Sequence, residues 1–248
     1  MKPYEHIILP LDVPTVQRAI ELVELLKDDV GVFKVGLELT NATGLETIAL
    51  LRQAGAKRIF YDAKLHDIPN TVAGAMRGIV RQRAWCVTVH TLGGRAMLRA
   101  AVDAAKSESQ ERGLPRPLVL GVTLLTSISE EELHTELKVP NSISVPAYAR
   151  HLAEMAYEAG CDGVIASPHE TETIRAAIPS SDFLIVTPGI RPAGSNRGDQ
   201  ARVHTPAEAI VRGANYLVIG RPIYEAPDPQ AAASAIAHEI EGAWELVG

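Results

Sequence analysis

Eight short apolar runs recur along the 248-residue chain, and they constrain its fold more than any other feature. Most are continuous rather than alternating, as in parallel strands that are covered on both faces. Stretches between them repeat apolar residues every three or four positions, as on one face of a helix. The expected strands are Ile7–Asp12, Val30–Leu37, Arg58–Lys64, Trp85–His90, Leu118–Leu125, Gly163–Ala166, Phe183–Pro188 and Tyr216–Gly220.

Alternating strands and helices with short connections form either a closed barrel or an open doubly wound sheet. An open nucleotide-binding sheet would usually carry a glycine-rich turn after its first strand. This chain has the segment Leu11–Pro14 there instead. We therefore predict an α/β fold, a single (β/α)8 TIM barrel of typical length, with residues 1–248 forming one domain.

Helix boundaries in the sequence agree with this fold. Three segments fit capping boxes, in which a Ser or Thr and a Glu three residues later bond the free N–H groups of a helix start. Pro206 would take the first helical position of the last one, and Gly55 and Gly160 are suited to positions just past helix ends. The three expected boxes are Thr43-x-x-Glu46, Ser129-x-x-Glu132 and Thr205-x-x-Glu208.

The composition argues against several classes of function. The formal net charge is −6 and no run of Lys and Arg forms a basic stripe, so we expect no nucleic-acid partner. No apolar stretch approaches the ~20 residues of a membrane span, and residues 1–13 do not suit a signal peptide. Cys86 and Cys161 have no metal-ligand spacing around them. We expect reduced structural thiols in a cytoplasmic protein.

Charged residues close the third expected strand, in the segment Phe60–Thr71 (FYDAKLHDIPNT). Asp62 and Lys64 are two residues apart, so on a strand they point to the same face. Asp67 lies beyond the strand, on the loop before Pro69 turns the chain. Charges placed there are costly unless they are paired or used. Either a structural ion pair or a catalytic acid kept charged by carboxylates fits this spacing.

Other strands are also expected to end in polar residues, at the carboxyl face where such barrels build their sites. Asp12 ends the first strand and Lys34 lies in the second. A lone charge at a strand end is more often a satisfied surface residue. Combined with Asp62, Lys64 and Asp67, however, Lys34 would complete a nearly neutral chain, which is how buried charges can coexist.

Three later loops carry groups that suit a polar ring or an anion. Thr126 and Ser127 follow the fifth strand, although hydroxyls there often only cap a turn. Residues 188–200 form a polar, glycine-bearing loop, which is either a surface loop or a lid. Gly220 and Arg221 end the eighth strand, where barrels commonly hold phosphate; a plain turn is the alternative.

The segment Asp62–Thr71 resembles the Asp-x-Lys-x-x-Asp-Ile-Pro-x-Thr signature of the orotidine 5'-phosphate decarboxylase family. The resemblance extends from Leu11–Asp12 to Gly220–Arg221, with the motifs in order. Pro10 and Ala63 depart from the family's usual residues without touching a charged or hydroxyl position. The resemblance implies cofactor-independent decarboxylation of orotidine 5'-phosphate to UMP, the last step of de novo pyrimidine nucleotide biosynthesis, with no metal.

The resemblance also implies a role for each site residue. Lys64 would donate a proton to the carbanion left on the ring, a step that suits a positioned ammonium. Asp62 would lie near the departing carboxylate and help hold Lys64 charged, and Lys34 and Asp67 would complete the catalytic charges. The substrate-binding residues would be Asp12, Lys34, Asp67 and Thr71 for the ribose, Thr126 and Ser127 for the pyrimidine, and Arg191, Gln200, Gly220 and Arg221 for the phosphate.

A homodimer with shared active sites follows from the same resemblance, because Asp67 and Thr71 would reach into the partner's site. Two other functions remain open. Magnesium-dependent sugar-phosphate decarboxylases and aldolases of the same suprafamily share Asp-x-Lys-x-x-Asp, but they place a carboxylate where this chain has Lys34. An inactive nucleotide-sensing barrel would not need Lys64 or Asp62, and both are present.

Overall fold

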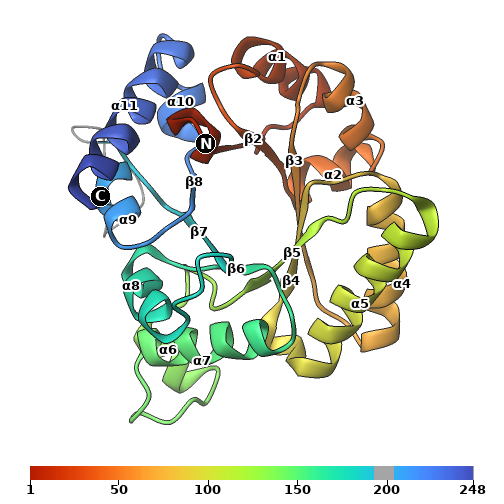
Figure 1. Cartoon of the computed structure of the whole chain (residues 1–248), viewed down its shortest axis with the longest axis vertical. Coiled ribbons are helices and arrows are strands. Elements are labelled where there is room, and N and C mark those ends of the chain that lie inside the picture. Colours follow the sequence, from red (N-terminus) through yellow and green to blue (C-terminus); the bar gives the residue numbers. More distant parts are fainter. Residues whose placement is uncertain (193–203, 248) are drawn as a thin grey trace.

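The computed structural model describes residues 1–192 and 204–247, and within them eight parallel strands close into a barrel (Figure 1). Each strand pairs with the next in the chain, and the last pairs with the first, so the predicted (β/α)8 barrel is confirmed. The strands are β1 (Ile7–Pro10), β2 (Val32–Val35), β3 (Ile59–Leu65), β4 (Cys86–His90), β5 (Leu118–Val122), β6 (Gly163–Ile165), β7 (Leu184–Pro188) and β8 (Tyr216–Val218).

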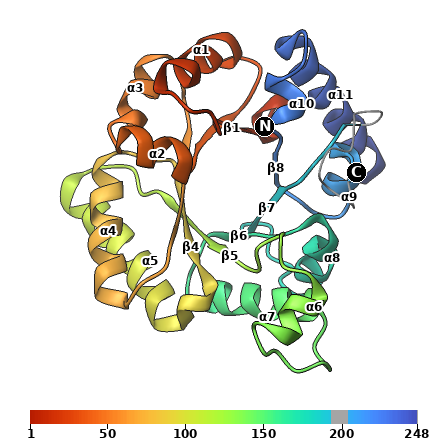
Figure 2. The same ribbon diagram turned by 180° about the vertical axis from the view of Figure 1, so that it is seen from behind.

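Helices surround the barrel in chain order, as Figure 1 and the reverse view in Figure 2 both show. None of the described helices is both long and apolar enough to cross a membrane. The helices are η1 (Pro3–His6), α1 (Val16–Leu26), α2 (Leu37–Thr43), α3 (Thr47–Gln53), α4 (Pro69–Arg81), η2 (Thr91–Gly93), α5 (Gly94–Arg112), α6 (Glu130–Thr135), α7 (Val145–Glu158), α8 (Pro168–Ala177), α9 (Pro206–Val211), α10 (Arg221–Tyr224) and α11 (Pro229–Val247).

Apolar side chains pack both inside the barrel and between the barrel and its helices. The long helices contribute buried stripes; in α1, for example, Ala19, Val23 and Leu26 are fully buried. Burying one such aliphatic side chain contributes about 1.5–3 kcal/mol, so the two layers hold the strand ends in fixed positions. The interior cluster consists of Ile8, Val32, Phe60, Cys86, Leu120, Val186 and Tyr216.

Cys86 and Cys161 are both buried free thiols, as expected from their spacing. Burial raises the pKa of the Cys86 thiol well above its ordinary value, and burial likewise raises the pKa of Cys161 to about 12. Neither thiol is therefore a reactive nucleophile at neutral pH.

Two of the three expected capping boxes form. Ser129 and Thr205 each accept from the backbone of the glutamate three residues on. The predicted box at Thr43 is wrong, because Thr43 is the last residue of α2 and its hydroxyl donates to Leu39 O at 2.6 Å. The two glycines predicted to follow helix ends do so with left-handed backbone, at φ 113° for Gly55 and 86° for Gly160.

Candidate active site

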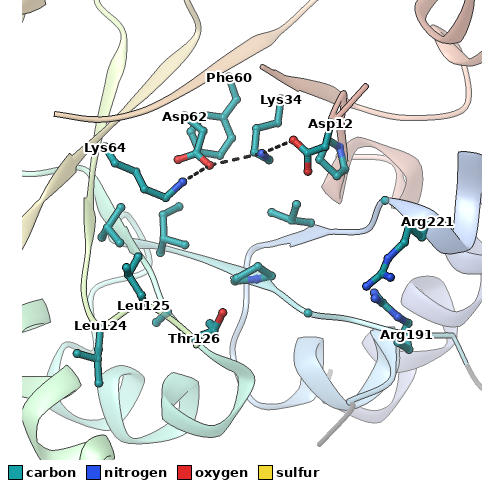
Figure 3. Close-up of a pocket in the computed structure, with 18 of the residues that line it drawn as sticks. Asp12, Lys34, Phe60, Asp62, Lys64, Leu124, Leu125, Thr126, Arg191 and Arg221 are labelled. Carbon is teal, nitrogen blue, oxygen red and sulfur yellow. Dashed lines mark hydrogen bonds and ion pairs between the residues drawn. The ribbon is translucent and has the colours of Figure 1, made fainter. Parts of the chain in front are cut away.

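A cavity of about 320 Å³ opens at the carboxyl end of the barrel, lined by residues that close or follow the strands. Small-molecule sites commonly measure roughly 300–1,000 Å³. Lys64 lies at one end of the cavity and two arginines lie at the other (Figure 3). The charged residues that line it are Asp12, Lys34, Asp62, Lys64, Arg191 and Arg221.

Four of these residues form a chain of alternating charge across the ends of three neighbouring strands (Figure 3). Lys64 Nζ donates to Asp62 Oδ2 at 2.7 Å. Lys34 Nζ lies 3.4 Å from the same oxygen and 3.4 Å from Asp12 Oδ1. Asp62 and Lys34 are buried, while the Lys64 side chain is 34% exposed toward the cavity. The four residues carry two positive and two negative charges, so the buried charges among them compensate one another.

Asp62 stays ionised despite its burial. Burial raises the pKa of this carboxyl, but the charges of Lys34 and Lys64 and hydrogen bonds from Lys64 and Thr88 outweigh it, so the pKa lies below the ordinary value. An ionised Asp62 provides Lys64 with a negative partner on the side away from bulk solvent.

The backbone that carries Lys64 departs from a regular strand. The pairing of β3 with β4 shifts register between Tyr61 and Leu65, and Lys64 has φ 47°. Positive φ is uncommon for a residue with a side chain and costs of order 1–3 kcal/mol unless the surroundings hold it. The Lys64 N–H donates to Thr88 Oγ1 at 2.9 Å, and that hydroxyl donates to Asp62 Oδ1 at 2.8 Å.

Arg191 and Arg221 place cationic groups at the opposite end of the cavity. Arg191 follows β7; it is buried, and its backbone N–H donates to His204 O at 3.0 Å. Arg221 begins α10, directly after β8. In Figure 3 the guanidinium ends of both side chains turn toward one another at the cavity. Two guanidiniums at one end of a cavity favour a dianionic group such as phosphate.

Gly220 precedes Arg221 at a point where the chain has no room for a side chain. A Cβ added there would lie 2.8 Å from Pro10 Cγ and 3.2 Å from Tyr224 Cε1. Gly220 itself lines the cavity, so its backbone can come close to a ligand.

Not all predicted site residues meet in this cavity. Thr126 lines it, whereas Ser127 is exposed beside it and is not part of its lining. Asp67 and Thr71 are also exposed and outside the lining. Gln200 lies outside the described residues.

Asp67 departs from the expected charge chain for a structural reason. β3 ends at Leu65 and α4 begins at Pro69, which carries the intervening loop outward. Asp67 Oδ1 accepts from the N–H of Ile68 at 2.6 Å, within its own loop. Within one chain, Asp12 rather than Asp67 therefore completes the series of alternating charges.

Thr88 and Tyr224 are site residues that inspection of the sequence missed. Thr88 is a fully buried residue of β4, and its only signal was a polar side chain within the apolar segment Cys86–His90. Tyr224 lines the cavity from α10, one turn after Arg221. Burial, followed by the charge of Asp12, raises the pKa of the Tyr224 phenol. No pattern in the sequence marked Tyr224.

Comparison with known proteins places this arrangement in a family. A protein named orotidine 5'-phosphate decarboxylase from Moorella thermoacetica is 49% identical over 241 residues, covering 97% of this chain and 94% of the relative. One of the same name from Syntrophomonas wolfei is 46% identical over 241 residues, covering 97% of this chain and all of the relative.

A solved structure shows the same fold. The crystal structure of orotidine 5'-phosphate decarboxylase from Lactobacillus acidophilus has a TM-score of 0.82 and 37% identity, covering 94% of this chain and 98% of that chain. The model of the orotidine 5'-phosphate decarboxylase / HUMPS family matches residues 5–236 of this chain. The chain therefore belongs to the orotidine 5'-phosphate decarboxylase / HUMPS family.

Proposed function

We propose that this protein decarboxylates orotidine 5'-phosphate to UMP without a cofactor, the last step of de novo pyrimidine nucleotide biosynthesis. The observation that carries the proposal is the cavity itself. An ammonium paired with a buried carboxylate lies at one end, and Arg191 and Arg221 lie at the other. The reacting group and the phosphate of a nucleotide would be held at these two ends. Relatives that are 42–49% identical carry the name of this activity.

Lys64 is the proposed proton donor. The bond between the ring and its carboxyl group breaks, carbon dioxide leaves, and the electron pair stays on the ring carbon. The ammonium of Lys64 stabilises that negative charge and then gives the carbon a proton, becoming an amine that solvent reprotonates. Asp62, 2.7 Å from Lys64 Nζ, holds the ammonium in place and would lie near the departing carboxylate. Lys34 balances the charge of Asp62 on its other side.

The remaining residues would bind the substrate. Arg191 and Arg221, together with Gly220 and Gln200, would hold the phosphate, whose binding energy orients the ring far from it. Thr126 and Ser127 would contact the pyrimidine beside the apolar lining of the cavity. Asp12, Lys34, Asp67 and Thr71 would bind the ribose hydroxyls.

The protein would act as a homodimer, with Asp67 and Thr71 entering the partner's site. Their exposure, outside the cavity of their own chain, supports this arrangement. Ile68 between them is 68% exposed. Leu37 and Leu92, also exposed, follow the neighbouring strands β2 and β4. Apolar side chains exposed at adjacent strand ends suit an interface. A cytoplasmic location would fit the free thiols.

One spectrophotometric assay tests the proposed function. Purified protein is mixed with orotidine 5'-phosphate in the presence of a chelator, and the loss of substrate absorbance is followed. We expect turnover that the chelator does not change. Activity that appears only when magnesium is restored would favour the metal-dependent relatives. Binding of the nucleotide without any turnover would identify a sensor and overturn the proposal.

A further inference from the structure

Thr88, on β4, forms hydrogen bonds to both Asp62 and Lys64 on the neighbouring strand β3. It is 0% exposed and lies on β4, beside the irregular part of β3. A hydroxyl has one proton to donate and lone pairs that accept. Thr88 Oγ1 uses both functions, because it accepts the Lys64 N–H at 2.9 Å and donates to Asp62 Oδ1 at 2.8 Å.

These two contacts act on different parts of the catalytic pair. The bond to the Lys64 N–H satisfies a backbone donor where the ladder between β3 and β4 is interrupted, and so supports the left-handed conformation of Lys64. The bond to Asp62 Oδ1 fixes the rotation of the carboxylate. Its other oxygen, Oδ2, then faces Lys64 Nζ at 2.7 Å and Lys34 Nζ at 3.4 Å.

We propose that Thr88 is a positioning residue for the decarboxylation, whose hydroxyl sets the orientation of Asp62 and the backbone conformation of Lys64. The inference rests on the proposed function and goes beyond it, since Thr88 does not line the cavity and would not touch the substrate. Thr88 would act through Asp62 and Lys64, which do line the cavity. A misplaced ammonium is expected to slow the chemical step rather than weaken nucleotide binding.

Replacing Thr88 by Val tests the role of the hydroxyl, because valine has the same shape and no polar group. The variant leaves the Lys64 N–H and Asp62 Oδ1 without their partner at a buried position. A hydrogen bond to a charged group corresponds to roughly a 10- to 100-fold effect, so we expect kcat to fall by that factor. KM should stay within about threefold, because the phosphate end is unchanged. Thr88→Ser restores the hydroxyl and should recover most of kcat.

Thr47→Val is the matched control. Thr47 is also 0% exposed, and its hydroxyl donates to Gly44 O at 2.8 Å and bonds Thr43, but it lies on α3, away from the cavity. This variant should lose thermal stability while keeping the kcat of the parent. Thermal unfolding of all the variants separates a loss of fold from a loss of rate.

The results separate the proposed decarboxylase activity from the proposed positioning role of Thr88. An inactive parent protein refutes the proposed function, and the role of Thr88 falls with it. An active parent with a Thr88→Val variant of equal kcat, however unstable, shows that Thr88 is only structural. A serine variant as slow as the valine variant excludes the hydroxyl as the cause. If the valine variant does not fold, Thr88→Cys is compared with Thr88→Ser, because cysteine has the shape of serine and a thiol is only a weak donor.

Discussion

Lys64 is the residue on which the proposed chemistry depends most directly. It lines the cavity from the end of β3, and its ammonium lies 2.7 Å from the carboxylate of Asp62. Arg191 and Arg221 lie at the opposite end of the cavity (Figure 3). Removing Lys64 should therefore abolish the chemistry and leave the phosphate site in place.

Lys64→Ala should lower kcat by more than about 1,000-fold, because general acid catalysis and stabilisation of the carbanion are both lost. The fold should persist, since Lys34 still lies 3.4 Å from Asp62. Binding of UMP, measured by titration calorimetry, should remain because Arg191 and Arg221 are intact. Lys57→Ala is the control: Lys57 also pairs with an aspartate, Asp28 at 3.1 Å, but is largely exposed. Residual activity of Lys64→Ala within tenfold of the parent would exclude Lys64 as the acid.

Arg221→Ala should lower kcat as well as raise KM. If the phosphate contacts orient the ring, losing one costs transition-state stabilisation as well as ground-state affinity. We expect kcat/KM to fall by roughly 10- to 100-fold, the range for a charge-assisted bond. Steady-state kinetics measure kcat and KM. The control is Arg212→Ala, because Arg212 is a partly exposed arginine whose guanidinium lies 3.6 Å from the Glu172 carboxylate. A change confined to KM would show that Arg221 only tethers the phosphate.

The sequence predicts which charged residues meet in the cavity, but not the buried residues that position them. Asp12, Lys34 and Asp62 meet because the carboxyl ends of parallel strands share one edge, which is a property of the fold. Thr88 could not be found this way, since threonine is an ordinary strand residue. Its role depends on the interrupted ladder between β3 and β4, which no local pattern predicts.

At the scale of elements, two helix starts use the same motif in opposite surroundings. Ser129 and Glu132 form a capping box at the exposed start of α6. Ser167 and Glu170 form another at α8, where Glu170 is 5% exposed. Hydrogen bonds from Ser129 lower the pKa of Glu132, whereas burial raises the pKa of Glu170 to about 7. A sequence shows the motif, but not whether its carboxylate is buried.

Glu170→Gln should therefore stabilise the protein at alkaline pH. The folded-state pKa of about 7 lies above the ordinary value of 4.5, so folded Glu170 keeps its proton longer than the unfolded chain does. Stability from this group is present below pH 4.5 and is lost as the pH rises to about 7. Glutamine accepts the same backbone bond without the charge. Urea unfolding should show no gain near pH 4 and a gain of about 1–3 kcal/mol at pH 8.

Glu132→Gln is the control of opposite sign. The pKa of Glu132 is lowered by its bonds to Ser129, so the ionised form is the one that the fold favours. Removing the charge should lower stability slightly at pH 8. A gain for Glu170→Gln that is the same at pH 4 and pH 8 would show that burial of the charge is not its cause.

For the whole molecule, the order and type of the strands followed from the apolar runs, while their ends did not. Val30–Leu37 was expected as one strand, but pairing stops at Val35 and Leu37 begins α2. Residues that follow the last paired residue of a strand can line the cavity. An apolar run in the sequence does not show where the hydrogen bonding between strands stops. Contacts with a partner chain are further beyond such patterns, because the role proposed for exposed Asp67 would arise only in an assembly.

The proposed sharing of active sites between two chains gives the last prediction. If Asp67 serves the partner's site, each site takes Lys64 from one chain and Asp67 from the other, and a twofold interface makes this reciprocal. Lys64→Ala and Asp67→Asn chains, each inactive alone, are co-refolded. In a hybrid dimer one site then collects both defects and the other collects neither. With random pairing about half the dimers are hybrids, so about a quarter of all sites should recover parental activity.

Activity of the mixture is compared with that of each variant refolded alone, and native mass spectrometry counts the hybrid dimers. If each site came from a single chain, every site in the mixture would lack either Lys64 or Asp67, and no activity could return. Recovery near zero with hybrids present would therefore refute the shared site. The decarboxylase proposal would stand, because the cavity with Lys64, Asp62 and the arginines is complete within one chain. The inactivity of Asp67→Asn would then need another cause, such as loss of the hydrogen bond that Asp67 Oδ1 accepts from the Ile68 N–H at 2.6 Å.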